Sequence, residues 1–434
     1  MKSLKIKALV ILMIMVLSIM TACSGNSNEK SSGSSKENGE KIELTFWNIW
    51  TEPSPQNEAS LKQVEKFMEE HPNIVIKQQN IPHDQFKVKV KTQAAGQQLP
   101  DLIQVFPGAE LTPLVDGELI QPIDDILSHW DGLINEGMLG DYKVGDKQYA
   151  LPANVTPTSL VYYNKSMLAE LGYDEFPKTY EELKTLITKI QDKDIIPIAL
   201  GNKAQWVLQS SYISTIGDRM TGSDFLTSVL NGEKKFTDER FVKAVGVIKE
   251  LADMKAFNED FNSIDNIQHR DLFVLDEAAM MIDGAWSLGP LLEAMEDDKN
   301  LGIAPFPAIE GGDGNPEAVS AVTGTGISLN SKLEGEKLEA AQEFLKSFYD
   351  EEYYSDLMKA DILVAADIEA PEGVSDALKE VSEIVSKQTS PVYDATIPVD
   401  VTDVINSGLQ EVSIGTLTPE ELAEKLQAAV DKQK

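Results

Sequence analysis

The chain has 434 residues, and its 38 basic and 71 acidic side chains give a formal net charge of -33 at pH 7. A surface this acidic repels nucleic-acid phosphates and anionic bilayers, so the composition argues against a nucleic-acid-binding protein and against electrostatic adhesion to a membrane. Hydrophobic residues make up 42% of the chain. Because a single core stops growing at about 250–300 residues, the length predicts two lobes.

The N-terminus has the pattern of a secretory signal peptide. Lys2, Lys5 and Lys7 precede an uncharged, almost wholly apolar run over residues 9–20. A run of about a dozen residues is too short to span a bilayer as a helix. This pattern is typical of a signal peptide, and we predict one over residues 1–22.

Cys23 is the only cysteine in the chain, and it follows the apolar run directly. The tetrapeptide ending at Cys23, Met-Thr-Ala-Cys, resembles a bacterial lipobox in which Met20 replaces the more usual leucine. The resemblance implies cleavage before Cys23 and acylation of its sulfur; in the alternative, an ordinary signal peptide is cleaved nearby and Cys23 is free or removed. Residues 24–40 contain no apolar side chain and are rich in Gly and Ser, as in flexible linkers. We therefore predict a lipidated cysteine and tether over residues 23–41, with the protein on the extracellular face of a bacterial cell membrane.

The remaining chain alternates between strand and helix patterns. Strands are expected at residues 42–47, 74–76, 102–106, 160–163, 197–200, 278–282 and 326–329, and helices at 58–70, 85–95, 179–191, 241–254 and 338–349. Thr179 and Glu182 have the spacing of a capping box, and Pro419 is placed to begin a C-terminal helix. The alternation predicts an α/β fold with parallel βαβ units.

Motifs that would indicate catalysis are missing from the sequence. The four histidines (His71, His83, His129 and His269) lack metal-ligand spacing, and neither a G-x-S-x-G nor a P-loop motif occurs. We expect no catalytic residue, no metal and no cofactor. A pair of carboxylates of the kind glycosidases use stays open, because 71 acidic residues make such pairs uninformative.

Several segments resemble the extracellular solute-binding protein family 1, the sugar-binding proteins of ABC importers. They run in family order from about residue 42 to the C-terminus: 45–50 (TFWNIW), 100–105, 149–152, 162–165, 177–183, 279–286, 305–307 and 418–430. The resemblance implies a two-lobe periplasmic-binding-protein-like fold of type II with a multi-crossover hinge. By segment matching, the chain would cross between lobes near residues 150–154, 319–325 and 360–366. The lobes would be 42–152 plus 325–362 and 153–324 plus 363–434.

The same resemblance implies the function. The protein would bind a carbohydrate, preferably an oligosaccharide, with high affinity outside the cell and deliver it to the membrane permease subunits of an ABC importer. It would act as a monomer without catalysis. Two alternatives stay open: a lipid-anchored glycoside hydrolase or lyase, and a receptor for another solute such as a peptide, a polyamine or a metal chelate.

A sugar has apolar C–H faces, which suit flat aromatic rings, and a rim of hydroxyls, which suits carboxylates and amides. Trp206 and Trp286 each follow a predicted strand, in the loops where α/β sheets bind ligands, so we predict that both are stacking platforms and not core residues. Trp50 follows the first strand and could cap the cleft. Asp283 could accept sugar hydroxyls or cap the following turn.

The other candidates are chosen by the same logic. Each either ends a strand, lies at a predicted crossing between lobes, or belongs to a segment where similar proteins place an aromatic residue; the alternative for each is ordinary loop or turn packing. Together with Trp50, Trp206, Asp283 and Trp286, the predicted ligand-binding set includes Asn48, Glu52, Phe106, Asn154, Thr156, Tyr393 and Asp394.

Overall fold

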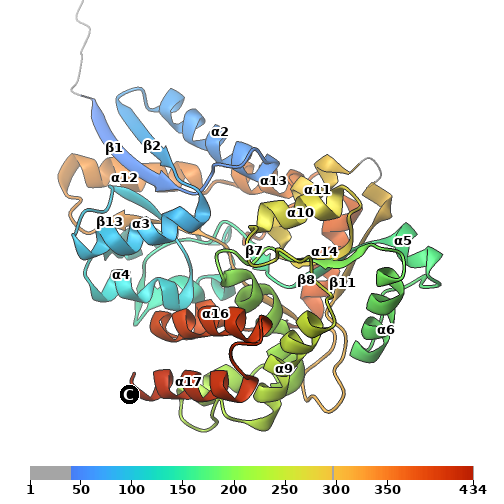
Figure 1. The fold of residues 1–434 in the computed structure, drawn as a ribbon. Helices are drawn as coiled ribbons and strands as arrows, with labels where there is room; N and C mark the ends of the chain where they lie inside the picture. Colours follow the sequence, from blue (N-terminus) through green and yellow to red (C-terminus); the bar gives the residue numbers. More distant parts are fainter. Residues whose placement is uncertain (1–40, 296–297, 434) are drawn as a thin grey trace, which may run out of the picture. The chain divides into compact units, whose positions relative to one another are not determined.

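The computed structural model describes residues 41–295 and 298–433. Residues Lys41–Lys434 form one compact unit (Figure 1). The predicted signal peptide, Cys23 and the tether to residue 40 lie outside the described residues. Within the described ranges, none of the helices combines the length and the apolar character that crossing a membrane would need.

The first sheet has the strand order β2-β1-β3-β13-β4. β1 is parallel to β2 and to β3, whereas β13 is antiparallel to β3 and β4. The apolar faces of α2 and α12 pack on this sheet and share a core with it. The bounds are β1 (Ile42–Asn48), β2 (Ile74–Asn80), β3 (Leu102–Val105), β4 (Ile120–Gln121), β13 (Gly326–Asn330), α2 (Pro55–Glu70) and α12 (Gly335–Phe348).

The second sheet has the order β11-β8-β10-β9. Only β9 and β10 are parallel; β8 is antiparallel to β10 and to β11. The predicted parallel pairing is present, since β1 is parallel to β2 and β3 and β9 is parallel to β10, but both sheets also contain antiparallel strands. β8 and β13 run opposite to their neighbours. Hydrophobic periodicity indicates the type of an element and not its direction, so the sequence pattern did not reveal this. The strands are β8 (Leu160–Asn164), β9 (Ile196–Ala199), β10 (Ala278–Asp283) and β11 (Leu301–Pro305).

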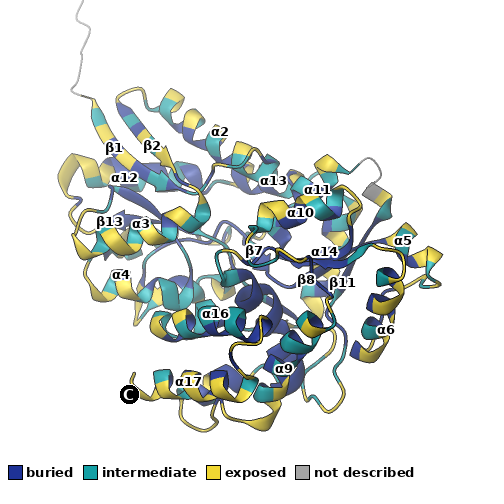
Figure 2. Cartoon of the chain, viewed as in Figure 1, coloured by how far each residue is buried: buried dark blue, intermediate teal, exposed yellow. Residues whose placement is uncertain are grey.

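Helices with one buried face surround these sheets, as the alternation of dark blue and yellow in Figure 2 shows for α9, α16 and α17. The predicted capping box at Thr179 forms, and the C-terminal helix begins at Pro419 as expected, with a second capping box at Thr418. The remaining helices are α3 (His83–Ala95), α4 (Thr112–Asp116), α5 (Lys165–Glu170), α6 (Tyr180–Gln191), α7 (Ser214–Thr221), α8 (Phe225–Leu230), α9 (Glu239–Asp253), α10 (Asn266–Val274), α11 (Leu288–Ala294), α13 (Glu351–Lys359), α14 (Asp376–Lys387), α15 (Tyr393–Thr396), α16 (Val399–Ser413) and α17 (Pro419–Asp431).

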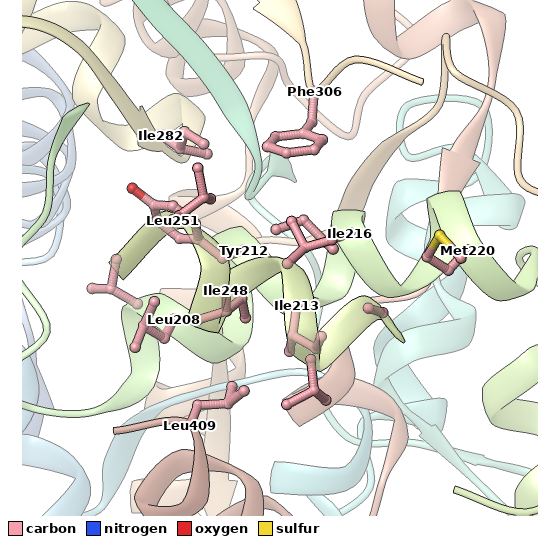
Figure 3. Close-up of a cluster of buried hydrophobic side chains, with 14 of the residues drawn as sticks. Leu208, Tyr212, Ile213, Ile216, Met220, Ile248, Leu251, Ile282, Phe306 and Leu409 are labelled. Carbon is pink, nitrogen blue, oxygen red and sulfur yellow. The ribbon is translucent and has the colours of Figure 1, made fainter. Parts of the chain in front are cut away.

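A buried π-helix, Leu208–Ile213, follows the helical turn that carries Trp206. All six of its residues are buried. Figure 3 shows Leu208, Tyr212 and Ile213 in a cluster with apolar side chains from α7, α9, β10 and α16. π-Helical turns are often found at functional sites, and here one fixes the start of a helix directly behind the Trp206 turn.

The three segments predicted to cross between lobes lie side by side. The backbone N–H of Gly324 donates to the carbonyl of Asn154 at 2.6 Å, and Asn154 also pairs with Val364. Next to this junction lies a small sheet of order β14-β12-β7, made of β7 (Val155–Pro157), β12 (Val319–Thr323) and β14 (Thr389–Ser390). A two-stranded hairpin, β5 (Lys143–Val144) and β6 (Lys147–Gln148), precedes it. The lobe boundaries themselves stay a prediction.

Candidate functional site

Aromatic side chains gather where the parallel strands of both sheets end. β1, β2 and β3 run the same way, so the residues after them share one edge of the first sheet. His83 follows β2 and Phe106 follows β3, while Trp206 and Trp286 follow β9 and β10 of the second sheet. The carboxyl ends of parallel strands are where open α/β sheets bind ligands, so both edges point to the same kind of site.

These four rings form a continuous line, which we call the aromatic row: Phe106, His83, Trp206 and Trp286. The ring centroids lie 5.4 Å apart from Phe106 to His83, 5.4 Å from His83 to Trp206, and 5.6 Å from Trp206 to Trp286. All four side chains are partly exposed. The row therefore joins the loops of the first sheet to those of the second, and it includes three of the predicted ligand-binding residues or platforms.

Trp286 ends the row and has an unused hydrogen-bond donor. Its Nε1 is buried and has no hydrogen-bond partner. Its six-membered ring lies so close over Gly284 that a Cβ there would come within 2.2 Å of it. An unpaired buried donor costs about 1–3 kcal/mol. The N–H is covered by the protein, so a ligand would meet the other, partly exposed atoms of Trp286.

A charged group adjoins the Phe106 end of the row. Lys87 Nζ lies 2.7 Å from Glu110 Oε1 and 4.4 Å from the centroid of the Phe106 ring. Burial disfavours the charged form of Lys87, but the neighbouring carboxylates of Glu110 and Asp394 outweigh it and raise its pKa. Burial raises the pKa of Asp394 to about 6, even though Lys87 acts in the opposite direction. The buried Gln209 amide faces Asp394 without a hydrogen bond of regular geometry.

The predicted residues after β1 are engaged within the protein. The buried Asn48 side chain donates to Gln78 Oε1 at 3.1 Å and accepts from the backbone N–H of Trp50 at 3.0 Å. Trp50 is buried in the first core and stacks on Phe348 with an interplanar angle of 7°. Asn48 and Trp50 therefore both stabilise the fold through these contacts. Their contact with a ligand stays a prediction.

Glu52 instead forms an ion pair with Arg270 of α10, which is mostly buried. This pair connects the loop after β1 to a helix beside the second sheet. A shallow cavity of about 490 Å³ adjoins it, lined in part by Glu52, Asn57 and Asn80. Glu52 therefore lies where the loop after β1 meets helix α10, whereas the aromatic row is built from other segments.

Four further candidates lie in packed surroundings. Asn154 donates to Thr156 Oγ1 at 2.7 Å beside the chain crossings. Asp283 is fully buried, where its Oδ2 accepts from Ser287 Oγ at 2.7 Å and lies 3.3 Å from His269 Nε2. Tyr393 is buried among the apolar side chains of the second core. Each of these residues packs against or hydrogen-bonds to other parts of the protein. Their contact with a ligand stays a prediction.

Sequence reasoning missed residues in the first turns of α3 and in the 3-10 turn after β3. His83, Asp84, Lys87 and Glu110 were not among the candidates. The helix was expected to begin only at Gln85, which left His83 and Asp84 outside it. The signal was present: residues after β2 must lie beside those after β3 once both strands are parallel to β1. The same rule had selected Phe106.

The chain is similar to proteins that bind solutes outside the cell. Residues 53–354 match the model of a family described as bacterial extracellular solute-binding protein. An uncharacterised ABC transporter extracellular-binding protein of Pyrococcus horikoshii is 25% identical over 312 residues, covering 68% of this chain and 67% of the relative. The diacetylchitobiose binding protein of Streptomyces coelicolor is 25% identical over 360 residues, covering 80% and 78%.

Solved structures of sugar-binding proteins have the same fold as this chain. A chitin oligosaccharide binding protein superposes with a TM-score of 0.84 at 25% sequence identity, covering 91% of this chain and 99% of that chain. The two sheets described above therefore belong to the two-lobe, type II architecture of sugar-binding proteins. The expected fold class is confirmed.

Proposed function

Because this chain belongs to the bacterial extracellular solute-binding protein family, we propose that it binds an oligosaccharide outside the cell and delivers it to an ABC importer. The observation that carries the proposal is the aromatic row, which joins loops of both sheets. Relatives that bind diacetylchitobiose and chitin oligosaccharides support the choice of solute class.

The site's chemistry suits a sugar. Indole rings cover apolar C–H faces, while the adjoining charged group around Lys87, Glu110 and Asp394 supplies donors and acceptors for hydroxyls. A ligand that contacts both sheets' loops stabilises the arrangement in which they meet, and an importer can respond to that arrangement. We propose that the lobes move about the junction of the three crossing segments.

A thermal-shift screen tests the solute class. The purified protein is melted with diacetylchitobiose, maltotriose, raffinose and xylobiose, and with a polyamine and a short peptide as controls. We expect one sugar to raise the melting temperature, because a ligand at 100 times its dissociation constant stabilises by about 2.7 kcal/mol. Stabilisation by a control and by none of the sugars would contradict the proposal. The same mixtures are analysed for cleaved sugar, which would indicate an enzyme.

We also propose that the mature protein is a lipoprotein anchored through Cys23. The motif that ends at Cys23, the only cysteine, supports this, since an acyl chain on that sulfur holds the protein at the membrane. Cys23→Ser is expected to move the protein from the membrane fraction to the soluble fraction in a cell fractionation. A mutant that stays with the membrane as completely as wild type would refute the anchor without affecting the sugar proposal.

A further inference from the structure

One carboxylate connects the first sheet's helix to a tryptophan of the second sheet. Asp84 lies in the first turn of α3, and its Oδ1 accepts a hydrogen bond from Trp206 Nε1 at 3.3 Å. The same oxygen lies 2.9 Å from His83 Nδ1. Asp84 thus holds two adjacent members of the aromatic row through one atom.

The bond has the properties of an orienting contact. Hydrogen bonding to His83 is the main cause that lowers the pKa of Asp84, so the carboxyl is charged at neutral pH; the Trp206 N–H adds to this effect. Hydrogen bonds to an ionised acceptor are about twice as strong as neutral ones. An indole has a single N–H donor, so this bond fixes the direction of the Trp206 ring.

The Asp84 side chain makes few other contacts with the protein. It is 42% exposed, and its hydrogen-bond partners are His83 and Trp206. The charge of Lys87 lowers the pKa of Asp84 further. Removing the Asp84 side chain therefore costs little packing. A flat ring that stacks on a sugar contributes fully only if its plane is held before the ligand arrives.

We propose that Asp84 is a positioning residue for sugar binding, which orients the Trp206 platform of the second sheet from helix α3 of the first. The proposal rests on the proposed function, since it assumes that the aromatic row stacks on a sugar. It assigns Asp84 no direct contact with the ligand. The competing hypothesis is that Asp84 contacts the sugar directly. The two hypotheses differ because only positioning requires the hydrogen bond between Asp84 and the Trp206 N–H.

A double-mutant cycle separates the two accounts. Phenylalanine at position 206 keeps a flat ring and removes the N–H donor. The sugar with the largest thermal shift in the screen is titrated by calorimetry into wild type, Asp84→Ala, Trp206→Phe and the double mutant. We expect Asp84→Ala to weaken binding about tenfold in the wild-type background and less than twofold in the Trp206→Phe background. Asp84→Asn, which keeps an acceptor oxygen without the charge, is expected to lose about threefold.

The matched control is Asp403→Asn. Asp403 is also an exposed aspartate and lies in α16. It forms an ion pair with Lys91 of α3 at 3.1 Å, and neither residue belongs to the aromatic row. Exposed pairs of this kind are worth little, so we expect its affinity to stay within twofold of wild type. An equal loss from Asp84→Ala in both backgrounds, or an equal loss from Asp403→Asn, would overturn the proposal.

A second readout needs no sugar. The indole N–H resonance of Trp206, identified in nitrogen-15-labelled protein by its disappearance in Trp206→Phe, is expected to shift in Asp84→Ala and to stay in place in Asp403→Asn. An unchanged resonance in Asp84→Ala overturns the positioning role. If no sugar binds wild type, the proposed function fails, and this resonance still decides whether Asp84 holds Trp206.

Discussion

Replacing Trp286 with alanine is expected to weaken sugar binding at least tenfold while the melting curve stays nearly unchanged. The indole ends the aromatic row, is partly exposed and has an Nε1 without a partner. An aromatic interaction is worth about 0.5–1.5 kcal/mol beyond the area it buries, and about 1.4 kcal/mol is one decade of affinity. Calorimetry and thermal unfolding measure the two quantities separately.

Trp130 provides the matched control. It is 2% exposed in the first core, and its Nε1 donates to the carbonyl of Tyr349 at 2.9 Å. Trp130→Ala is expected to lose the roughly 3–5 kcal/mol of stability typical of a truncated core tryptophan, while the folded fraction binds sugar normally. If Trp286→Ala instead loses stability on that scale and keeps its affinity, Trp286 is a packing residue and not a platform.

Gly108→Ala is expected to keep the turn after β3 apart from helix α15 and to lower sugar affinity more than tenfold. Gly108 begins the 3-10 turn after β3, with φ at +64°, and a Cβ there would lie 2.1 Å from the carbonyl oxygen of Ala395 in α15. Backbone atoms cannot yield as a flexible side chain can, so the turn and α15 would have to separate. Small-angle scattering should show a radius of gyration that no longer falls when sugar is added.

Gly145 separates this steric effect from backbone strain. Its φ is +60°, almost the same as at Gly108, but a Cβ there would meet nothing within 4 Å. Both alanine variants therefore carry a similar left-handed backbone cost, of about 1–2 kcal/mol, and only one adds a clash. We expect Gly145→Ala to bind sugar and to contract like wild type. If both variants bind sugar and contract to the same extent, the contact between Gly108 and Ala395 is not needed for the protein to contract around its ligand.

Local interactions explain which features could be read directly from the chain. The capping boxes at Thr179 and Thr418 join residues three apart, so their pattern is complete within four letters of sequence. The strands that precede Trp206 and Trp286 are recognisable from their apolar, β-branched or Met-rich runs, and the positions of both indoles a few residues later follow from where those runs end. The structure places the two residues in short helical turns and not in loops. The structure brings the two rings together, with centroids 5.6 Å apart, and their role in stacking on a ligand stays a prediction.

Tertiary structure alone decided the rest. Asn48 and Asp283 have the residue types of ligand-binding side chains, but partners elsewhere in the fold bury both of them. Asp84 has no sequence signal beyond its position after β2, and its bond to Trp206 spans 122 residues. The direction of a side chain depends on which distant segment packs against its strand or helix, and short-range patterns carry no record of that partner. The sequence by itself therefore determined the family, the main strands and helices, and the positions of Trp206 and Trp286 after two strands. Packing between distant segments decided which side chains contact those tryptophans.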